Sequence, residues 1–362
     1  MKTAIVKQVL DVYGPWASRP WHDGKEKQLL DKWPGKISYW EMTCLFKADW
    51  YIVPQQINLA YTHESVLQHN REDFVRRHTD GVLALEDIPF SDYDVIITLD
   101  PILNITSPSN ALVACVANEH WDPIYARALV APAAGTDLFL AHMLDAQDTV
   151  TSLPQAVSFP YPRSPDTVRS LFPASKEEIA FVDWRTLVEL GHTTNWSDAT
   201  DAAVLRLEEA LAIPIRYHKF VKDDAPYGIS DPPRWGEGTI YYGDLSRSKY
   251  FLSVGRDNGA GQALCDAATT GAICFGERNK VYHRTICHPS CLCNDLSELP
   301  QRFRTVQGNV GLHSEILEWQ DARLHEHFVR RPMAILEKAL ALKTGRPGEA
   351  VACRFEHQKP RR

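Results

Sequence analysis

The chain has 362 residues, of which 44% are hydrophobic and 23% are charged. This apolar fraction excludes an extended disordered chain, and chains of this length usually fold as two domains. The net charge of −7 does not favour nucleic acid as a partner, because a nucleic-acid surface needs concentrated basic side chains.

No apolar run reaches the length of about 18 residues that a transmembrane helix needs. Residues 1–16 are typical of a strand and not of an export signal, since Lys7 and Asp11 interrupt the apolar stretch. Without an export signal, we expect the eight cysteines to be reduced and the chain to be cytoplasmic. The basic tail 343–362 is interpreted as a solvated terminus or as a peripheral membrane contact.

The first half alternates strand and helix signals, and its β-branched and aliphatic runs are typical of strands covered on both faces. The sequence predicts a helix over 66–77 and a short apolar segment at 81–85. The predicted strands are 3–6, 50–53, 94–99 and 111–117.

A proline-rich stretch at 151–175 separates this half from a second alternating set. The predicted organisation is a first domain over 1–155, a linker over 156–175, a second domain over 176–330, and a terminal helix with a basic tail over 331–362. In the second half the predicted strands are 178–182, 213–217, 250–254 and 272–275. The predicted helices are 201–211, 262–270, a segment from 312 to Pro332, and 333–342.

Polar side chains follow the predicted strands of the first half, where an acceptor hydroxyl could be deprotonated. Asp100 ends one strand, and Glu119 and His120 end the next. The loop 13–24 follows the first strand; it carries aromatic side chains and His22, a rival base. Helix caps and turn carboxylates give the same pattern, so both interpretations stay open.

The most informative stretch is 248–276, which is typical of a strand, a glycine loop, a helix, a glycine stop and a further strand. A glycine loop that leads into a helix can expose backbone N–H groups to a phosphate. Lys249 and Arg256 are expected to complete such a site. A tight βα turn without a ligand is the alternative.

This stretch resembles the C-terminal nucleotide-sugar-binding domain of GT-B glycosyltransferases, above all in the helix and glycine of 263–271. The resemblance implies an α/β fold of two Rossmann-like domains facing an interdomain cleft. It implies that Gly259, Gly261 and Gln262 face the donor phosphate and that Asp266 binds the donor ribose. Asn258 stands where retaining members carry a second acidic residue, so a retaining or an inverting outcome stays open.

On this fold, cations at strand ends would neutralise the leaving phosphate, and we assign Arg185 and Lys219 to that role. No metal or other cofactor is expected. The pair Asp92 and Asp94 precedes its strand, unlike the metal-binding motif of the other large glycosyltransferase fold. Cysteines 287, 291 and 293, with His283, resemble only half of a zinc site. His288 and Pro289 resemble a pair found in transferases that use CMP-sugars.

The expected function is transfer of a sugar from a nucleotide-activated donor to an acceptor hydroxyl, as in bacterial-type surface glycan or glycoconjugate synthesis, without a metal. The alternatives are a GT-B-shaped epimerase or phosphorylase, a DNA-modifying glycosyltransferase, and a non-catalytic sugar-binding protein. The expected partners are a nucleotide sugar and a glycan acceptor, with no nucleic acid.

Overall fold

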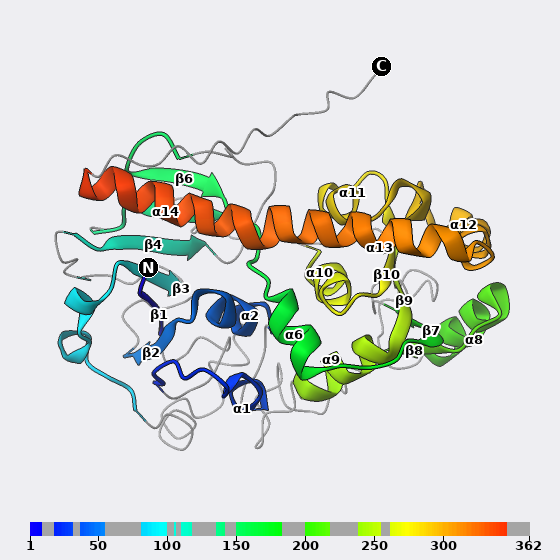
Figure 1. The fold of residues 1–362 in the computed structure, drawn as a ribbon, viewed down its shortest axis with the longest axis horizontal. Helices are drawn as coiled ribbons and strands as arrows, with labels where there is room; N and C mark the ends of the chain where they lie inside the picture. Colours follow the sequence, from blue (N-terminus) through cyan, green and yellow to red (C-terminus); the bar gives the residue numbers. More distant parts are fainter. Residues whose placement is uncertain are drawn as a thin grey trace.

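The computed structural model describes two α/β domains side by side (Figure 1). The residues that it describes are 1–8, 18–31, 37–54, 81–99, 105, 110–117, 135–141, 150–182, 200–217, 238–254 and 261–345. The predicted α/β class with two Rossmann-like domains is confirmed, because each domain is built on its own parallel sheet.

The first domain contains a six-stranded parallel sheet with the order β2-β1-β3-β4-β5-β6. Its central strands are buried on both faces, which explains why they form continuous apolar runs in the sequence. The strands are β1 (Thr3–Gln8), β2 (Asp49–Val53), β3 (Val95–Leu99), β4 (Leu112–Ala117), β5 (Leu138–Ala141) and β6 (Gln155–Ser158). All four predicted strands are present here, and β5 and β6 are additional. The predicted helix 66–77 lies outside the described residues.

The second domain contains a five-stranded parallel sheet with the order β11-β10-β9-β7-β8. The predicted helices at 201–211 and 262–270 are confirmed as α8 and α10. The strands are β7 (Glu177–Val182), β8 (Ile215–Tyr217), β9 (Ser248–Ser253), β10 (Ile273–Glu277) and β11 (Leu292–Cys293). The helices are α8 (Thr200–Leu211), α9 (Gly238–Arg247), α10 (Gln262–Thr269), α11 (Val281–Ile286) and α12 (Leu299–Gln307).

Two helices of the first domain lie toward the second domain. They are α1 (Glu26–Asp31), which contacts α9, and α2 (Ile37–Phe46). Apolar side chains of both domains belong to one continuous buried cluster. The two sheets therefore share a core where the domains meet.

In its described segments, the chain crosses between the domains twice. The first crossing follows β6 and leads into α6 (Pro165–Leu171), inside the predicted linker. The second is a nearly continuous helix, formed by α13 (Val310–Leu324), a π-helical segment (His325–Arg330) and α14 (Arg331–Thr344). Figure 1 shows this helix running from the second domain back over the first, where α14 contacts β4.

The predicted break in this helix at Pro332 is wrong. Pro332 has no N–H to donate to the oxygen of Phe328, four residues earlier, but that oxygen instead accepts from the backbone N–H of Arg163 at 2.9 Å. The change of helical geometry comes earlier, in the π-helical segment. None of the helices that the structure describes is long and apolar enough to span a bilayer.

Candidate functional site

The glycine that precedes α10 is required by its backbone and by its surroundings. Gly261 has a φ of +60°, in the left-handed region that favours glycine. A Cβ atom placed there would lie 2.7 Å from the Cβ atom of Tyr282, on α11. Gly261 therefore lets α10 begin close against α11, and Gln262 is the first residue of the helix.

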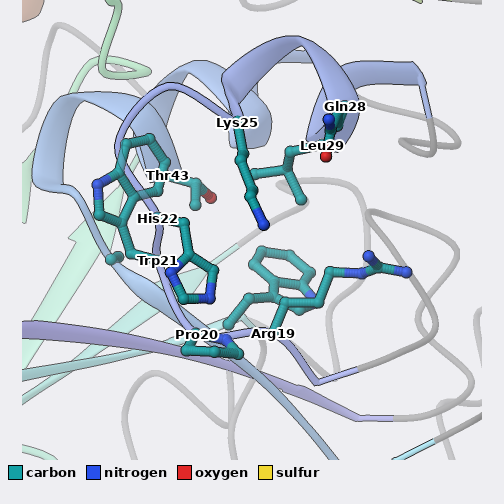
Figure 2. A pocket seen from close by; sticks show the side chains of 10 residues that line it. Arg19, Pro20, Trp21, His22, Lys25, Gln28, Leu29 and Thr43 are labelled. Atoms are coloured by element: carbon teal, nitrogen blue, oxygen red, sulfur yellow. The ribbon is translucent and has the colours of Figure 1, made fainter.

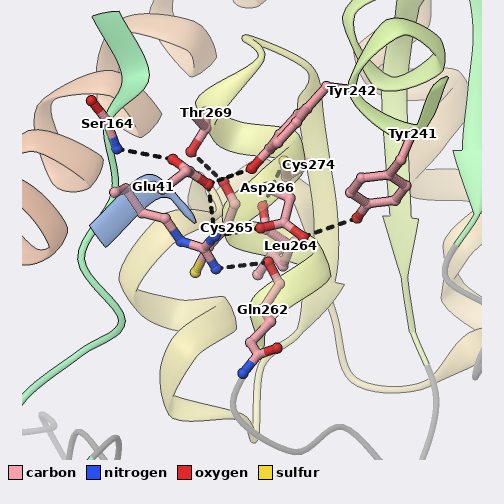
Figure 3. A network of polar contacts seen from close by, with 11 residues as sticks. Glu41, Ser164, Tyr241, Tyr242, Gln262, Leu264, Cys265, Asp266, Thr269 and Cys274 are labelled. Atoms are coloured by element: carbon pink, nitrogen blue, oxygen red, sulfur yellow. Dashed lines mark hydrogen bonds and ion pairs between the residues drawn. The ribbon is translucent and has the colours of Figure 1, made fainter. Parts of the chain in front are cut away.

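Asp266 lies on the buried side of α10, where the two domains meet the linker. One of its carboxylate oxygens accepts a hydrogen bond from the Tyr241 hydroxyl at 3.0 Å, and the other forms an ion pair with Nη1 of Arg163. Arg163 is fully buried, and its Nη2 donates to the backbone oxygen of Gln262 at 3.2 Å. The linker is thus attached to the first turn of α10 (Figure 3).

A second buried carboxylate from the first domain shares the same guanidinium. Glu41, on α2, accepts from Arg163 Nη1 at 2.8 Å and from the backbone N–H of Ser164 at 2.9 Å. The Tyr242 hydroxyl, on α9, also donates to Glu41. The cluster of Glu41, Arg163, Tyr242 and Asp266, called the junction cluster below, therefore connects both domains and the linker.

The charges of the junction cluster are unequal, because one guanidinium faces two carboxylates. Burial raises the pKa of Asp266 to about 6; Arg163 lowers this pKa, and Glu41 raises it. Burial opposes the charge on Arg163, yet Asp266 and Glu41 together raise the pKa of Arg163 above its ordinary value. Burial, followed by the charge of Glu41, raises the pKa of Tyr242. Arg163 therefore stays charged, and Asp266 takes up a proton more readily than an ordinary aspartate does.

The contacts of Asp266 bear directly on its predicted role. To accept two ribose hydroxyls, its carboxylate would have to exchange the contacts with Tyr241 and Arg163 that it makes here. Its donor-binding role, like the roles of Gly261 and Gln262, stays a prediction.

Lys249 lies away from the glycine loop. It is the second residue of β9, whereas the loop follows the opposite end of that strand. Its ammonium group is 2.7 Å from a carboxylate oxygen of Glu178, and the Tyr250 hydroxyl donates to the other oxygen of Glu178 at 2.7 Å. The expectation that Lys249 completes a site at the loop is therefore corrected: the sequence places it beside the loop, but the strand separates the two.

His22 lies on the wall of a cavity of about 250 Å³ in the first domain (Figure 2). The segment before α1 pairs with the edge of β2: the N–H of Arg19 donates to the oxygen of Trp50 at 2.7 Å, and the reverse bond is 2.8 Å. The Trp21 N–H donates to Asp49, the first residue of β2, at 2.6 Å, and this bond holds the segment two residues after Arg19. The side chains that line the cavity include Arg19, Pro20, His22, Lys25, Leu29 and Trp50.

The other candidate residues lie outside the described residues, and their roles stay predictions. All of them follow predicted strands or belong to the glycine loop. They are Asp100, Glu119, His120, Arg185, Lys219, Arg256 and Gly259.

The described residues contain no group of three or more His, Cys, Asp or Glu side chains that could hold a metal ion. Burial raises the pKa of the thiols of Cys287, Cys291 and Cys293, and Nδ1 of His283 accepts from the backbone N–H of Glu277 at 2.8 Å. His288 instead forms an N-cap: its Nδ1 accepts from the N–H of Ser290 at 3.2 Å.

The junction cluster was not anticipated from the sequence, although signals for it exist. Glu41 is the only charged residue in an otherwise apolar or uncharged helix, ISYWEMTCLF. Arg163 is the only charged residue in the proline-rich segment 159–165. An isolated charge in such surroundings indicates a buried partner, because burying an unpaired charge is costly.

No protein-family model matches the chain, and no curated protein is similar to it at a significant level. Several solved structures are similar over most of the chain. A glycosyltransferase from Rickettsia africae ESF-5 is 11% identical, with a TM-score of 0.45, over 94% of this chain and 99% of that one. AviGT4, a glycosyltransferase involved in avilamycin A biosynthesis, is 13% identical, with a TM-score of 0.45, over 94% and 98%. T4 phage BGT, in complex with UDP and Mn2+, is 11% identical, with a TM-score of 0.41, over 94% and 99%. The likeness is distant, so no residue role is transferred from these proteins.

Proposed function

We propose that this chain transfers a sugar from a nucleotide-activated donor to an acceptor hydroxyl. The observation that carries the proposal is the position of α10. The helix whose sequence resembles a nucleotide-sugar-binding element begins at a constrained glycine, and it lies where two Rossmann-like domains meet. Ligands of such open parallel sheets bind outside the carboxyl ends of the strands, and α10 follows the carboxyl end of β9.

In the proposed reaction, the bond between the anomeric carbon and the phosphate oxygen breaks, and the nucleotide leaves with that electron pair. The acceptor oxygen forms the new glycosidic bond, and its proton passes to a general base. The candidate bases are Asp100, Glu119, His120 and His22. Arg185, Lys219 and Arg256 would stabilise the negative charge on the leaving phosphate, so the proposed reaction needs no divalent metal.

The first experiment is a thermal-shift screen with UDP-, GDP-, dTDP- and CMP-sugars, because a ligand that binds only the folded state raises its apparent stability. We expect one nucleotide class to raise the Tm of the chain, with and without EDTA. Asp266→Asn should weaken this shift, and Asp295→Asn, an exposed carboxylate on the second domain, should leave it unchanged. The proposal fails if no nucleotide sugar shifts the Tm and none is turned over.

The second experiment offers the identified donor with a range of acceptors. We propose surface glycans or glycoconjugates as the acceptors, so transfer to an oligosaccharide is the expected result. Release of a free sugar epimer without an acceptor would instead indicate an epimerase. Salt-sensitive binding and glycosylation of duplex DNA would indicate a DNA-modifying enzyme, and binding without turnover would indicate a sugar-binding protein.

A further inference from the structure

The cavity beside β2 carries positive charge that no described acidic side chain neutralises. Arg19 and Lys25 line it, together with His22, which can donate an N–H. None of the described residues that line it is acidic. Among the described residues, neither Arg19 nor Lys25 has an ion-pair partner, and Nε of Arg19 is buried without a hydrogen bond.

The acidic side chains of the same segment are already bonded to other groups. Asp23 accepts from Nε1 of Trp21 at 3.0 Å and lies 2.9 Å from Nζ of Lys47. Glu26 accepts from the backbone N–H of Gly24 at 3.0 Å. Within the part of the chain that the structure describes, the positive side of the cavity therefore has no counter-charge, and an anion would supply the acceptor that Arg19 Nε lacks there.

The remaining walls indicate what the anion is attached to. Pro20, Leu29 and the buried Trp50 form an apolar part of the lining, together with a few polar groups, which is the usual composition of a small-ligand site. A volume of about 250 Å³ exceeds that of one phosphate and lies just below the roughly 300–1,000 Å³ of sites for larger ligands. This space suits one phosphate with one sugar ring.

The cavity lies on the side of the first domain that faces the second. Lys25 immediately precedes α1, and α1 contacts α9 of the second domain. Figure 2 shows Lys25 reaching from the start of α1 toward the segment that carries Arg19 and His22. From these observations we infer that the cavity binds a phosphorylated sugar group of the acceptor, with the phosphate held between Arg19 and Lys25. This inference rests on the proposed transferase function.

The test is calorimetric titration of the full chain with glucose 6-phosphate, glucose, inorganic phosphate and UDP. We expect glucose 6-phosphate to bind, and glucose and inorganic phosphate each to bind at least about tenfold more weakly. Lys25→Met and Arg19→Met should each weaken glucose 6-phosphate binding about tenfold or more, since each removes a charged hydrogen-bond donor. Lys25 is exposed, so its variant tests the site without disturbing the core.

The matched control is Lys27→Met, which removes the same charge two residues further along the chain, in α1 and outside the cavity, where Lys27 pairs with Asp31 at 3.6 Å. The inference is overturned if Lys27→Met weakens binding as much as Lys25→Met, if glucose binds as tightly as its phosphate, or if no probe binds. Equal binding of inorganic phosphate would overturn the sugar assignment, and displacement of glucose 6-phosphate by UDP would assign the cavity to a nucleotide.

Failure of the inference about the cavity can be distinguished from failure of the proposed transferase function. Donor binding, measured by thermal shift on the same variants, should not change in Lys25→Met. A preparation that turns over a nucleotide sugar but does not bind glucose 6-phosphate overturns only the inference. A preparation that binds glucose 6-phosphate in the cavity but neither binds nor turns over any nucleotide sugar overturns the proposed function.

Discussion

Arg163 is the residue on which the junction between the domains depends. Arg163→Met would leave Glu41 and Asp266 buried without their counter-charge, which typically costs about 3–5 kcal/mol of stability. Arg247→Met is the control: it removes an exposed arginine 2.7 Å from Asp244, and its effect should stay within about 0.5 kcal/mol. The free energies of unfolding come from urea denaturation.

A second variant separates charge burial from lost packing. Combining Arg163→Met with Glu41→Gln and Asp266→Asn removes both buried carboxylates that have lost their counter-charge, so part of the lost stability should return. If Arg163→Met and Arg247→Met have equal effects, or if the triple variant is no more stable than Arg163→Met, the junction cluster does not stabilise the fold in this way.

Asp266 should make the stability of the chain depend on pH. Its pKa in the folded chain is about 6, above the ordinary 3.8, so between these values the folded state binds more protons than the unfolded state. The contribution of Asp266 to the free energy of unfolding is therefore greatest below about pH 4. It falls by roughly 3 kcal/mol as the pH rises to about 6. Asp266→Asn removes this contribution.

The measurement is the free energy of unfolding of both proteins at several pH values from 4 to 8. The stability of the original chain relative to Asp266→Asn should fall between pH 4 and 6 and stay constant above about pH 7. A difference that does not change with pH would show that Asp266 does not take up a proton in the folded state.

At the scale of elements, the start of α10 depends on Gly261. Alanine at a left-handed position costs about 1–2 kcal/mol, and here its Cβ atom would also meet Tyr282 at 2.7 Å. Gly271, just after α10, has a φ of +77° but nothing within 4 Å of the Cβ position. Gly261→Ala should therefore destabilise the chain by about 1–3 kcal/mol more than Gly271→Ala. Equal Tm values for the two variants would contradict this close contact.

The elements also show what the sequence could and could not reveal. The runs 94–99 and 250–254 predicted strands correctly, because strands buried on both faces keep an apolar side chain at nearly every position. Helix α2 was missed, since its side chains from Tyr39 to Cys44 are all buried and its sequence has no amphipathic period. Strands β5 and β6, of four residues each, are too short for a clear pattern.

The candidate site was harder to predict than the fold. Asp266 and Glu41 are 225 positions apart, and each forms an ion pair with Arg163 of the linker. Such an ion pair depends on tertiary packing and leaves no local spacing to recognise. In contrast, part of the need for glycine at position 261 is local, because its left-handed φ belongs to the turn that begins α10. His22 could be identified as a loop residue, but its cavity depends on the pairing of Arg19 with β2.

At the scale of the whole molecule, the two crossings of the chain lie together. The backbone N–H of Arg163, in the first crossing, donates to the oxygen of Phe328, in the π-helical segment of the second, at 2.9 Å. Beyond this point α14 covers the first domain, and Nζ of Lys343 lies 2.6 Å from Asp137, which also accepts from the N–H of Val113. The last helix therefore attaches the second domain to the sheet of the first.

Leu336 tests this attachment, because its side chain is fully buried in α14, whereas Leu342 on the same helix is 45% exposed. Leu336→Ala should cost about 2–5 kcal/mol of unfolding free energy, and Leu342→Ala less than about 0.5 kcal/mol.

Since one buried cluster spans both domains, calorimetry of the original chain should show a single unfolding transition. Loosening α14 removes cover from the first domain and leaves the second sheet intact, so Leu336→Ala should separate this transition into two. One transition with the same Tm in both variants would show that α14 does not couple the domains.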